Sequence, residues 1–262
     1  MSREPLAGKV AIVTGGGTLF GEAVVKTLVS DGAKVVSVDI NQESGAPAAR
    51  RAGAIFVAGD ITKDDAIAEI VKKTITEFGK IDILVNLACS YDDAGADSTR
   101  EQWLNTTNVN LISAAMLGQA VRPHMARNGG GSIVNLTSIS AAVAQIGRWI
   151  YPVSKAALLQ LTRNMAMDYA PDKIRVNSVS PGWTWSAIMN MLSKGDREKT
   201  DRVAAPFHLT GRVGDPEEVA NVISFLCSDK AGVVTGADWA ADGGYSAMGP
   251  EQAVPAIPLL EA

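Results

Sequence analysis

The chain has 262 residues, of which 47% are hydrophobic and 20% are charged, and its formal net charge is −4. No apolar run approaches the ~18 residues that a membrane-crossing helix needs, and the acidic balance leaves no broad basic surface for phosphates. These features argue against membrane and nucleic-acid partners. The start lacks the apolar core of a signal peptide, and the two distant cysteines form neither a disulfide framework nor a metal site. We therefore expect a reduced, cytoplasmic protein without a bound metal.

Short β-branched runs alternate with amphipathic stretches from Lys9 onwards. This alternation is typical of βαβ units on a parallel sheet. Six runs predict strands, and a further strand is expected near residues 236–240. The six predicted strands are 10–13, 35–38, 55–57, 81–85, 133–136 and 176–179.

Capping signals mark the helices that are predicted between these strands. Ser98 and Glu101 form a capping-box pattern, Asp215 precedes a proline at a helix start, and glycines follow the helices predicted at 22–30 and 63–78. Another helix is expected from about Tyr151 through 158–169. No repeat or linker interrupts this pattern, so we expect one domain over residues 1–248 and a proline-rich tail over 249–262.

A glycine-rich run follows the first predicted strand and leads into a helix. Residues 14–21 read Thr-Gly-Gly-Gly-Thr-Leu-Phe-Gly. Glycines in this place let backbone amides at a helix N-terminus face a pyrophosphate. A glycine cluster taken alone is also compatible with a tight strand-to-helix turn.

Asp39 ends the second predicted strand. A carboxylate at that position accepts hydrogen bonds from both ribose hydroxyls of an adenosine and repels a 2′-phosphate. No Arg or Lys occurs in residues 14–21 or directly after Asp39 to offset that repulsion. The sequence therefore favours NAD over NADP, the alternative being a solvated aspartate at a strand end. Asp60 ends the next run in the same way.

Tyr151 and Lys155 stand four residues apart in a predicted helix, so both side chains project from one face. A tyrosine has an unperturbed pKa of about 10, and a neighbouring ammonium favours the phenolate that a general base requires. Ser138 follows the strand at 133–136, at the sheet edge where ligands bind in open α/β folds. Its hydroxyl is therefore a candidate for holding a substrate oxygen.

These motifs together resemble the single-domain short-chain dehydrogenase/reductase family over about residues 6–246. The glycine-rich run resembles the family's T-G-x-x-x-G-x-G. Asn110, Ser138, Tyr151 and Lys155 match its catalytic residues in identity and order. The resemblance implies a Rossmann-like, doubly wound α/β fold, with a seven-stranded parallel sheet that carries helices on both faces. It also implies that residues 1–248 form a dinucleotide-binding catalytic domain.

Further motifs along the chain match the family's cofactor site. Residues 86–89 resemble N-N-A-G, residues 180–182 resemble the turn beside the nicotinamide, and residues 242–244 match the closing D-G-G. The cofactor contacts implied by the resemblance are Gly15, Gly17, Thr18, Leu19, Phe20, Gly21, Asp39, Asp60, Ile61, Asn86, Ala88, Tyr151, Lys155, Pro181, Gly182, Thr184 and Ser186.

The chain departs from the family pattern without losing a catalytic group. Leu19 replaces a glycine of the phosphate loop, which adds a side chain where the backbone approaches the pyrophosphate. Leu87 and Cys89 replace an asparagine and a glycine, so one polar contact is lost and a thiol is placed near the nicotinamide ribose. Ser186 stands where the family often has threonine and keeps the hydroxyl.

The resemblance also implies a mechanism. Tyr151 takes the hydroxyl proton of an alcohol while a hydride moves to NAD⁺, and ketone reduction reverses both transfers. Lys155 binds the nicotinamide ribose and stabilises the phenolate, and Ser138 orients the substrate oxygen. Asn110 holds a water that links Lys155 to solvent.

The sequence indicates the substrate less clearly than it indicates the cofactor and the catalytic residues. Trp149, Trp183 and Trp185 surround the expected pocket, and residues 183–206 correspond to the family's variable substrate lid. These aromatic rings favour an apolar or aromatic substrate, although packing within the lid explains them equally well. Arg148 and Gln145 are candidates for polar recognition or simply face solvent, and Tyr91 is another pocket candidate. The substrate contacts that we predict are Ser138, Ser140, Gln145, Trp149, Tyr151 and Trp183.

The leading interpretation is an NAD-dependent dehydrogenase or ketoreductase acting on a small-molecule secondary alcohol or ketone. The alternatives are a reductase of carrier-bound β-ketoacyl groups or of activated double bonds, and a non-catalytic NAD-sensing scaffold on the same fold. The resemblance implies a homotetramer or a dimer. The apolar end of the tail at 249–262 leads us to expect that it docks near a subunit contact or an active-site mouth, a disordered end being the alternative.

Overall fold

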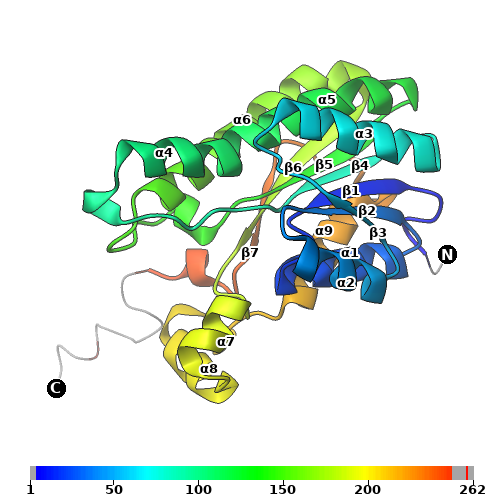
Figure 1. The fold of residues 1–262 in the computed structure, drawn as a ribbon. Helices are drawn as coiled ribbons and strands as arrows, with labels where there is room; N and C mark the ends of the chain where they lie inside the picture. Colours follow the sequence, from blue (N-terminus) through cyan, green and yellow to red (C-terminus); the bar gives the residue numbers. More distant parts are fainter. Residues whose placement is uncertain (1–3, 250–257, 259–262) are drawn as a thin grey trace.

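The computed structural model describes residues 4–249 and residue 258. Seven strands form one parallel sheet in the order β3-β2-β1-β4-β5-β6-β7 (Figure 1). They are β1 (Val10–Thr14), β2 (Lys34–Asp39), β3 (Ile55–Ala58), β4 (Ile83–Asn86), β5 (Gly131–Leu136), β6 (Ile174–Pro181) and β7 (Asp238–Ala241). The Rossmann-like α/β fold expected from the sequence is confirmed.

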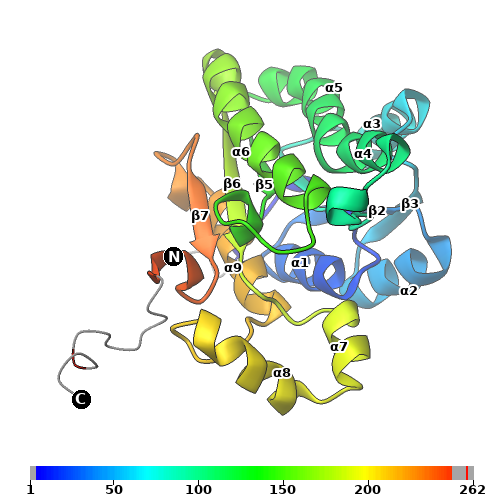
Figure 2. The same ribbon diagram turned by 90° about the vertical axis from the view of Figure 1, so that its left-hand side faces the viewer.

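Helices cover both faces of this sheet. Helices α3, α5 and α6 lie over one face and α1, α2 and α9 over the other, whereas α7 and α8 lie apart from both layers (Figures 1 and 2). The helices are α1 (Leu19–Ser30), α2 (Gln42–Ala52), α3 (Asp64–Phe78), α4 (Arg100–Thr107), α5 (Ser113–Arg127), α6 (Ile150–Tyr169), α7 (Ala187–Ser193), α8 (Arg197–Ala204) and α9 (Pro216–Cys227).

Strand β1 shows why the sheet needs helices on both sides. Successive side chains of a strand point to opposite faces. Ala11 and Val13 pack into one buried cluster with Val24 of α1, and Ile12 packs into a second cluster with Ile70 of α3. Both faces of the strand are therefore apolar and buried, which is the usual state of a parallel sheet.

The chain order reverses at β1, which pairs with both β2 and β4. Val13 lies opposite Ser37 on one side and Val85 on the other. In open α/β sheets the loops diverge at such a reversal and leave a crevice at the carboxyl ends of the strands. The fold therefore places the expected ligand site beside the loop that follows β1.

The sequence pattern does not predict α2, because Gly45 and Pro47 are poor helix formers. The structure explains Gly45, where an added Cβ would lie 2.3 Å from the ring of Phe56. The Asn41 side chain accepts hydrogen bonds from the N–H groups of Glu43 and Ser44 and so begins the helix. Close packing on β3 and a strong cap outweigh the weak helix propensity here.

The capping box of α4 is shifted by one residue from the predicted pair Ser98 and Glu101. Thr99 and Gln102 form it instead, each side chain bonding to the other residue's backbone N–H. The Ser98 hydroxyl is engaged elsewhere, because it accepts from the Ala94 N–H and donates to Asp93.

The edge strand β7 holds its neighbours through one carboxylate. Asp238 accepts hydrogen bonds from the hydroxyls of Ser178 and Ser180 on β6 and from that of Thr137, which follows β5. All three hydroxyls belong to buried residues. The carboxylate therefore fastens the end of β5 to the edge of the sheet.

Among the described residues, no helix combines the length and apolar character that crossing a membrane requires. The expected docking of the tail at 249–262 concerns residues that, apart from Gly249 and residue 258, lie outside the described part of the chain.

Candidate active site

The glycine-rich run forms a turn between β1 and the N-terminus of α1. The Thr18 side chain caps this helix by accepting from the Gly21 N–H at 2.9 Å. Gly21 packs so closely on the turn that an added Cβ would lie 2.1 Å from the carbonyl oxygen of Gly15. The turn therefore requires glycine for its own packing.

The same turn fits a phosphate group. The N–H groups of Leu19 and Phe20 begin α1 and have no carbonyl acceptor among the described residues. Free N–H groups at a helix N-terminus bind anions through hydrogen bonds and the helix dipole. The Leu19 side chain is 44% exposed, so it does not fill the turn that the family's glycine would leave open.

Asp39 lies at the end of β2, against this turn. Its carboxylate accepts hydrogen bonds from the N–H groups of Gly17 at 2.8 Å and Asn41 at 2.9 Å. These bonds fix the carboxylate beside the turn. Each carboxylate oxygen keeps a further lone pair with which a ribose hydroxyl can bond.

Asp60 and Ile61 follow β3 on the same sheet edge. The Asp60 carboxylate accepts from both the hydroxyl and the N–H of Thr62. The hydroxyl hydrogen bond of Thr62 holds the pKa of Asp60 below its ordinary value. The side chain therefore stays ionised and oriented at neutral pH, and Ile61 is buried beside it.

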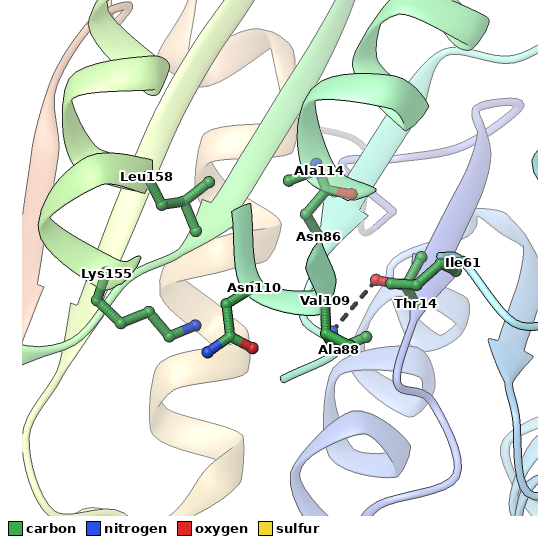
Figure 3. A pocket seen from close by; sticks show the side chains of 9 residues that line it. All are labelled: Thr14, Ile61, Asn86, Ala88, Val109, Asn110, Ala114, Lys155 and Leu158. Carbon is green, nitrogen blue, oxygen red and sulfur yellow. Dashed lines mark hydrogen bonds between the residues drawn. The ribbon is translucent and has the colours of Figure 1, made fainter. Parts of the chain in front are cut away.

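A small cavity separates β1 and β4 from α5 and α6 (Figure 3). Thr14 borders it and accepts hydrogen bonds from the N–H groups of Leu87 and Ala88, which ties the ends of the two strands together. The Asn86 side chain donates to Asn135, but its amide oxygen is buried and has no hydrogen-bond partner among the described residues. Lys155 and Asn110 also line the cavity. The unpaired oxygen marks the polar end of the space.

Asn110 lies in a single π-helical turn, Asn108–Ile112, between α4 and α5. Its amide oxygen accepts from the Ser90 N–H at 2.7 Å, and its amide nitrogen donates to the Ser90 carbonyl and the Ser154 hydroxyl. The amide therefore joins the loop after β4 to α6. Such turns are often found at functional sites.

Tyr151 and Lys155 lie one turn apart in α6 and are both buried. The Lys155 ammonium lies 5.6 Å from the centre of the Tyr151 ring and donates to the Leu136 carbonyl at 2.7 Å. This hydrogen bond holds the ammonium at the end of β5. The predicted pair is therefore brought to the carboxyl edge of the sheet.

Ser138, Ser140 and Gln145 form a hydrogen-bonded series after β5. The Ser138 hydroxyl donates to Ser140, whose hydroxyl donates to Gln145, and the Ser140 N–H donates back to Ser138. The Ser138 oxygen lies two residues beyond the carbonyl that anchors Lys155. The three predicted residues therefore act as one polar group at the strand end.

Two side chains from the loop after β4 line the same region. The Tyr91 ring stacks on the Tyr151 ring with centroids 5.0 Å apart. Burial raises the pKa of the Cys89 thiol, and the nearby Lys155 ammonium acts in the opposite direction. The thiol of Cys89 is therefore protonated at neutral pH.

The other predicted residues follow β6. Pro181 ends that strand, Gly182 packs on Asp242, and the Trp183 N–H donates to the His208 ring. Trp183 also stacks on Phe207. These contacts fix the turn from which residues 183–206 continue.

Thr184 and Ser186 are both held by hydrogen bonds near the start of that segment. Thr184 forms an isolated bridge with Gly214, and the Ser186 hydroxyl caps α7 by accepting from the Met189 N–H. Trp149, another predicted substrate contact, lies directly before α6 and is 53% exposed.

Asp93 is a residue that the sequence pattern does not single out. Its carboxylate accepts hydrogen bonds from the N–H groups of Trp149 at 3.0 Å and Tyr151 at 2.8 Å, and from the Gly95 N–H. No side chain of α6 itself caps this helix. The loop after β4 therefore supplies the cap of the helix that carries Tyr151 and Lys155.

We expect Asp93→Asn to lower turnover and stability together, because the neutral amide accepts these N–H groups less strongly. An N-cap contributes about 0.5–2 kcal/mol, and each kcal/mol shifts the Tm by about 2–4 °C in a domain of this size. Calorimetry, together with kcat and the Kd of the cofactor, checks the prediction. A fall in kcat at an unaltered Kd identifies a positioning role, and the exposed Asp97→Asn is the matched control.

The same interaction has a defined pH dependence. Burial works to raise the pKa of Asp93, but the N–H groups of Trp149 and Tyr151 hold it below the ordinary value. The stabilisation is therefore present above the ordinary pKa of ~3.9 and is lost as the pH falls through the lower folded-state value. A difference in Tm between wild type and Asp93→Asn that persists below that range contradicts this account.

The doubly wound parallel sheet, with a glycine-rich turn at its reversal point, defines a Rossmann-like α/β protein. Residues 19–246 match a family model described as enoyl-(acyl carrier protein) reductase. The chain belongs to the short-chain dehydrogenase/reductase family of oxidoreductases, whose members typically bind a nicotinamide cofactor.

Three relatives illustrate the range of names in this family. The chain is 37% identical to cis-4-hydroxycyclohexanecarboxylate dehydrogenase of Sinomonas cyclohexanicum over 94% of this chain and 99% of that protein. It is 36% identical to human dehydrogenase/reductase SDR family member 4 over 92% and 89% of the two chains. It is also 36% identical to the 3-oxoacyl-[acyl-carrier-protein] reductase of Thermotoga maritima over 91% and 98%.

Proposed function

We propose that this protein transfers a hydride between NAD(H) and a small secondary alcohol or its ketone. The observation that carries the proposal is the placement of Tyr151 and Lys155 on one buried face of α6, with Lys155 bonded to the end of the strand that leads to Ser138. This placement supports the proposal, because it sets a phenol and an ammonium side by side at the strand end that Ser138 follows.

The roles of the side chains follow from their chemistry. Tyr151 accepts the hydroxyl proton of the alcohol or donates it to the ketone, and the Lys155 charge stabilises its phenolate form. Ser138 donates a hydrogen bond to the substrate oxygen. Lys155 also binds the nicotinamide ribose, and Asn110 holds the loop after β4 against α6 so that this face keeps its shape. Bound NAD⁺ supplies the hydride acceptor.

The cofactor binds along the carboxyl edge in this proposal. Its pyrophosphate lies against the residues from Gly15 to Gly21, and Asp39 holds the adenosine ribose. Asp60 and Ile61 contact the adenine, and Asn86 and Ala88 contact the adjoining ribose. The remaining contacts with the nicotinamide half come from Pro181, Gly182, Thr184 and Ser186. All of these residues end a strand or follow the carboxyl end of one.

We expect NAD(H) to be preferred over NADP(H) because the Asp39 carboxylate would repel a 2′-phosphate. Hydrogen bonds to a charged group contribute enough for about a tenfold or larger preference in Kd and in kcat/KM. Asp39→Asn keeps an acceptor for the Gly17 N–H but removes the charge, and should narrow this preference. Titration of both cofactors by fluorescence, with the exposed Asp65→Asn as control, measures it. Equal affinity of the wild type for both cofactors refutes the assignment.

We infer that the substrate is apolar or aromatic, because the segment at 183–206 exposes apolar side chains. Ile188, Met191 and Leu192 of α7 are all substantially exposed. Such side chains accommodate apolar ligands through soft, polarizable contacts. The relative from Sinomonas cyclohexanicum, by its name, oxidises a substituted cyclohexanol, which agrees with a ring-bearing secondary alcohol here.

The alternatives predict other surfaces. A reductase of carrier-bound groups needs a basic docking patch, whereas the loop beside Tyr91 carries Asp92, Asp93 and Asp97. A panel of secondary alcohols assayed for NADH formation, with the ketones assayed in reverse, tests the proposal. Turnover of carrier-bound β-ketoacyl groups or enoyl compounds, but of no alcohol or ketone in the panel, assigns the protein to the first alternative. Cofactor binding without any turnover assigns it to the scaffold.

A further inference from the structure

Arg148 is an exposed residue beside the candidate active site, and its charge has no ion-pair partner among the described residues. It lies two residues before the start of α6, and its guanidinium carbon lies 5.7 Å from the centre of the Tyr151 ring. The side chain makes no hydrogen bond or ion pair with any residue that the structure describes, and this ring contact is its one specific interaction there. A full positive charge therefore lies over the ring that we assign to proton transfer.

The nearest acidic loop does not neutralise this charge. The Asp93 carboxylate is taken up by the N–H groups at the start of α6. Asp92 accepts from the Gln102 side chain instead. The guanidinium nevertheless reaches the site electrostatically, because it opposes the effect of burial, which raises the pKa of both Tyr91 and Cys89.

An arginine in this setting has a definite chemical preference. Its planar guanidinium binds a carboxylate through two parallel hydrogen bonds, which fixes the orientation of the bound group as well as its charge. The Tyr151 ring next to it stacks on the Tyr91 ring, and flat rings of this kind pack against an apolar or aromatic body. The site thus offers an apolar surface with the Arg148 cation at its margin, in addition to the buried Lys155 ammonium.

We propose that Arg148 binds a carboxylate of the substrate, so that the preferred substrates are hydroxy acids or oxo acids with an apolar ring or chain between the two groups. The guanidinium lies 5.7 Å from the centre of the Tyr151 ring, so a substrate that reaches both Arg148 and the Tyr151 hydroxyl carries its carboxylate apart from the carbinol carbon. This inference rests on the proposed alcohol dehydrogenase function and narrows its substrate class.

A different role for Arg148 is to stabilise the Tyr151 phenolate, which would help every substrate equally. The two roles differ in how activity depends on the substrate's charge. A carboxylate site changes the ratio of kcat/KM for an acid to that for its neutral analogue. An effect on the phenolate leaves that ratio constant and moves the pH profile for neutral alcohols.

The test compares three secondary alcohols of similar shape: 4-(1-hydroxyethyl)benzoate, 4-(1-hydroxyethyl)benzamide and 1-phenylethanol. Wild type, Arg148→Met and Arg148→Lys are assayed with NAD⁺ at low ionic strength. Arg163→Met is the matched control, because Arg163 is an exposed arginine of α6 whose side chain bonds, among the described residues, to Gln160 alone. Calorimetry on each variant establishes that it is folded.

We expect wild type to favour the benzoate over the benzamide, and Arg148→Met to reduce that ratio about tenfold or more, as for loss of a charged hydrogen-bonding pair. Arg148→Lys should retain part of the preference, and Arg163→Met should retain all of it. The effect should appear mainly in KM and weaken with added salt. Unsubstituted benzoate should also bind more weakly to the cofactor complex of Arg148→Met than to that of wild type, as measured by tryptophan fluorescence.

The outcomes distinguish a failure of the Arg148 proposal from a failure of the proposed dehydrogenase function. Turnover of the neutral alcohols with no preference for the acid overturns the Arg148 proposal and leaves the dehydrogenase function standing. An equal loss on all three substrates in Arg148→Met, with a shifted pH profile, assigns Arg148 to the phenolate instead. If none of the three alcohols and no member of the wider alcohol panel is oxidised, the proposed function itself fails.

Discussion

Tyr151→Phe should abolish turnover while leaving NAD(H) binding nearly intact. The substitution removes one oxygen and keeps the ring that stacks on Tyr91, so the local packing is preserved. General acid–base catalysis contributes about 10²- to 10⁴-fold, and we expect kcat to fall by at least that range. Initial rates of NADH formation, together with cofactor titration by fluorescence, measure the two effects separately.

Tyr169→Phe provides a matched control for this experiment. Tyr169 is buried like Tyr151 and ends the same helix, but it packs in the core beneath the sheet rather than at its carboxyl edge. That variant should keep wild-type turnover. A Tyr151→Phe enzyme that retains more than about a tenth of wild-type activity is incompatible with the proposed acid–base role.

Lys155→Met should lose both turnover and cofactor affinity. Methionine is an unbranched side chain one heavy atom shorter than lysine, and it lacks both the charge that stabilises a phenolate and the donor that bonds to Leu136. Loss of a buried charged hydrogen bond costs about 1.5–3 kcal/mol, so the Kd of NAD⁺ should rise by about tenfold or more. The fall in kcat should exceed the change in Kd, because Tyr151 also loses the positive charge that stabilises its phenolate form.

The affinity measurement decides the role of Lys155. Lys72, an exposed lysine of α3 that pairs with Glu69, gives the control variant Lys72→Met. A Lys155→Met protein that binds NAD⁺ as tightly as wild type, yet turns over slowly, would remove the ribose contact from the proposal. Full activity would remove the catalytic role as well.

The architecture follows closely from sequence because its signals are local and redundant. In β1 the run Val-Ala-Ile-Val is apolar throughout, and both faces of the strand are buried. Helix α9 begins at a proline that follows Asp215, as the capping rules predict. Helix α2 escapes prediction because its stability comes from contacts of Gly45 with β3 rather than from its own composition.

Part of the candidate site can also be predicted from local sequence signals. Tyr151 and Lys155 are recognisable by spacing within one helix, and Asp39 by its place at a strand end. Asp93 is different, because its hydrogen bond to the Tyr151 N–H joins residues 58 positions apart and leaves no local pattern. The π-helical turn at Asn110 likewise depends on packing between α4, α5 and α6, which propensities do not encode.

The role of Asp238 bears on when the protein becomes competent during synthesis. Chains emerge from the ribosome N-terminus first, and the glycine-rich turn at residues 14–21 is among the earliest parts to leave. Thr137, adjacent to Ser138, obtains its carboxylate partner only from β7, near the other end of the chain. Strands β1 to β6 are therefore synthesised before the carboxylate that fastens Thr137 to the edge of the sheet, and the sheet is complete only when β7 has followed them.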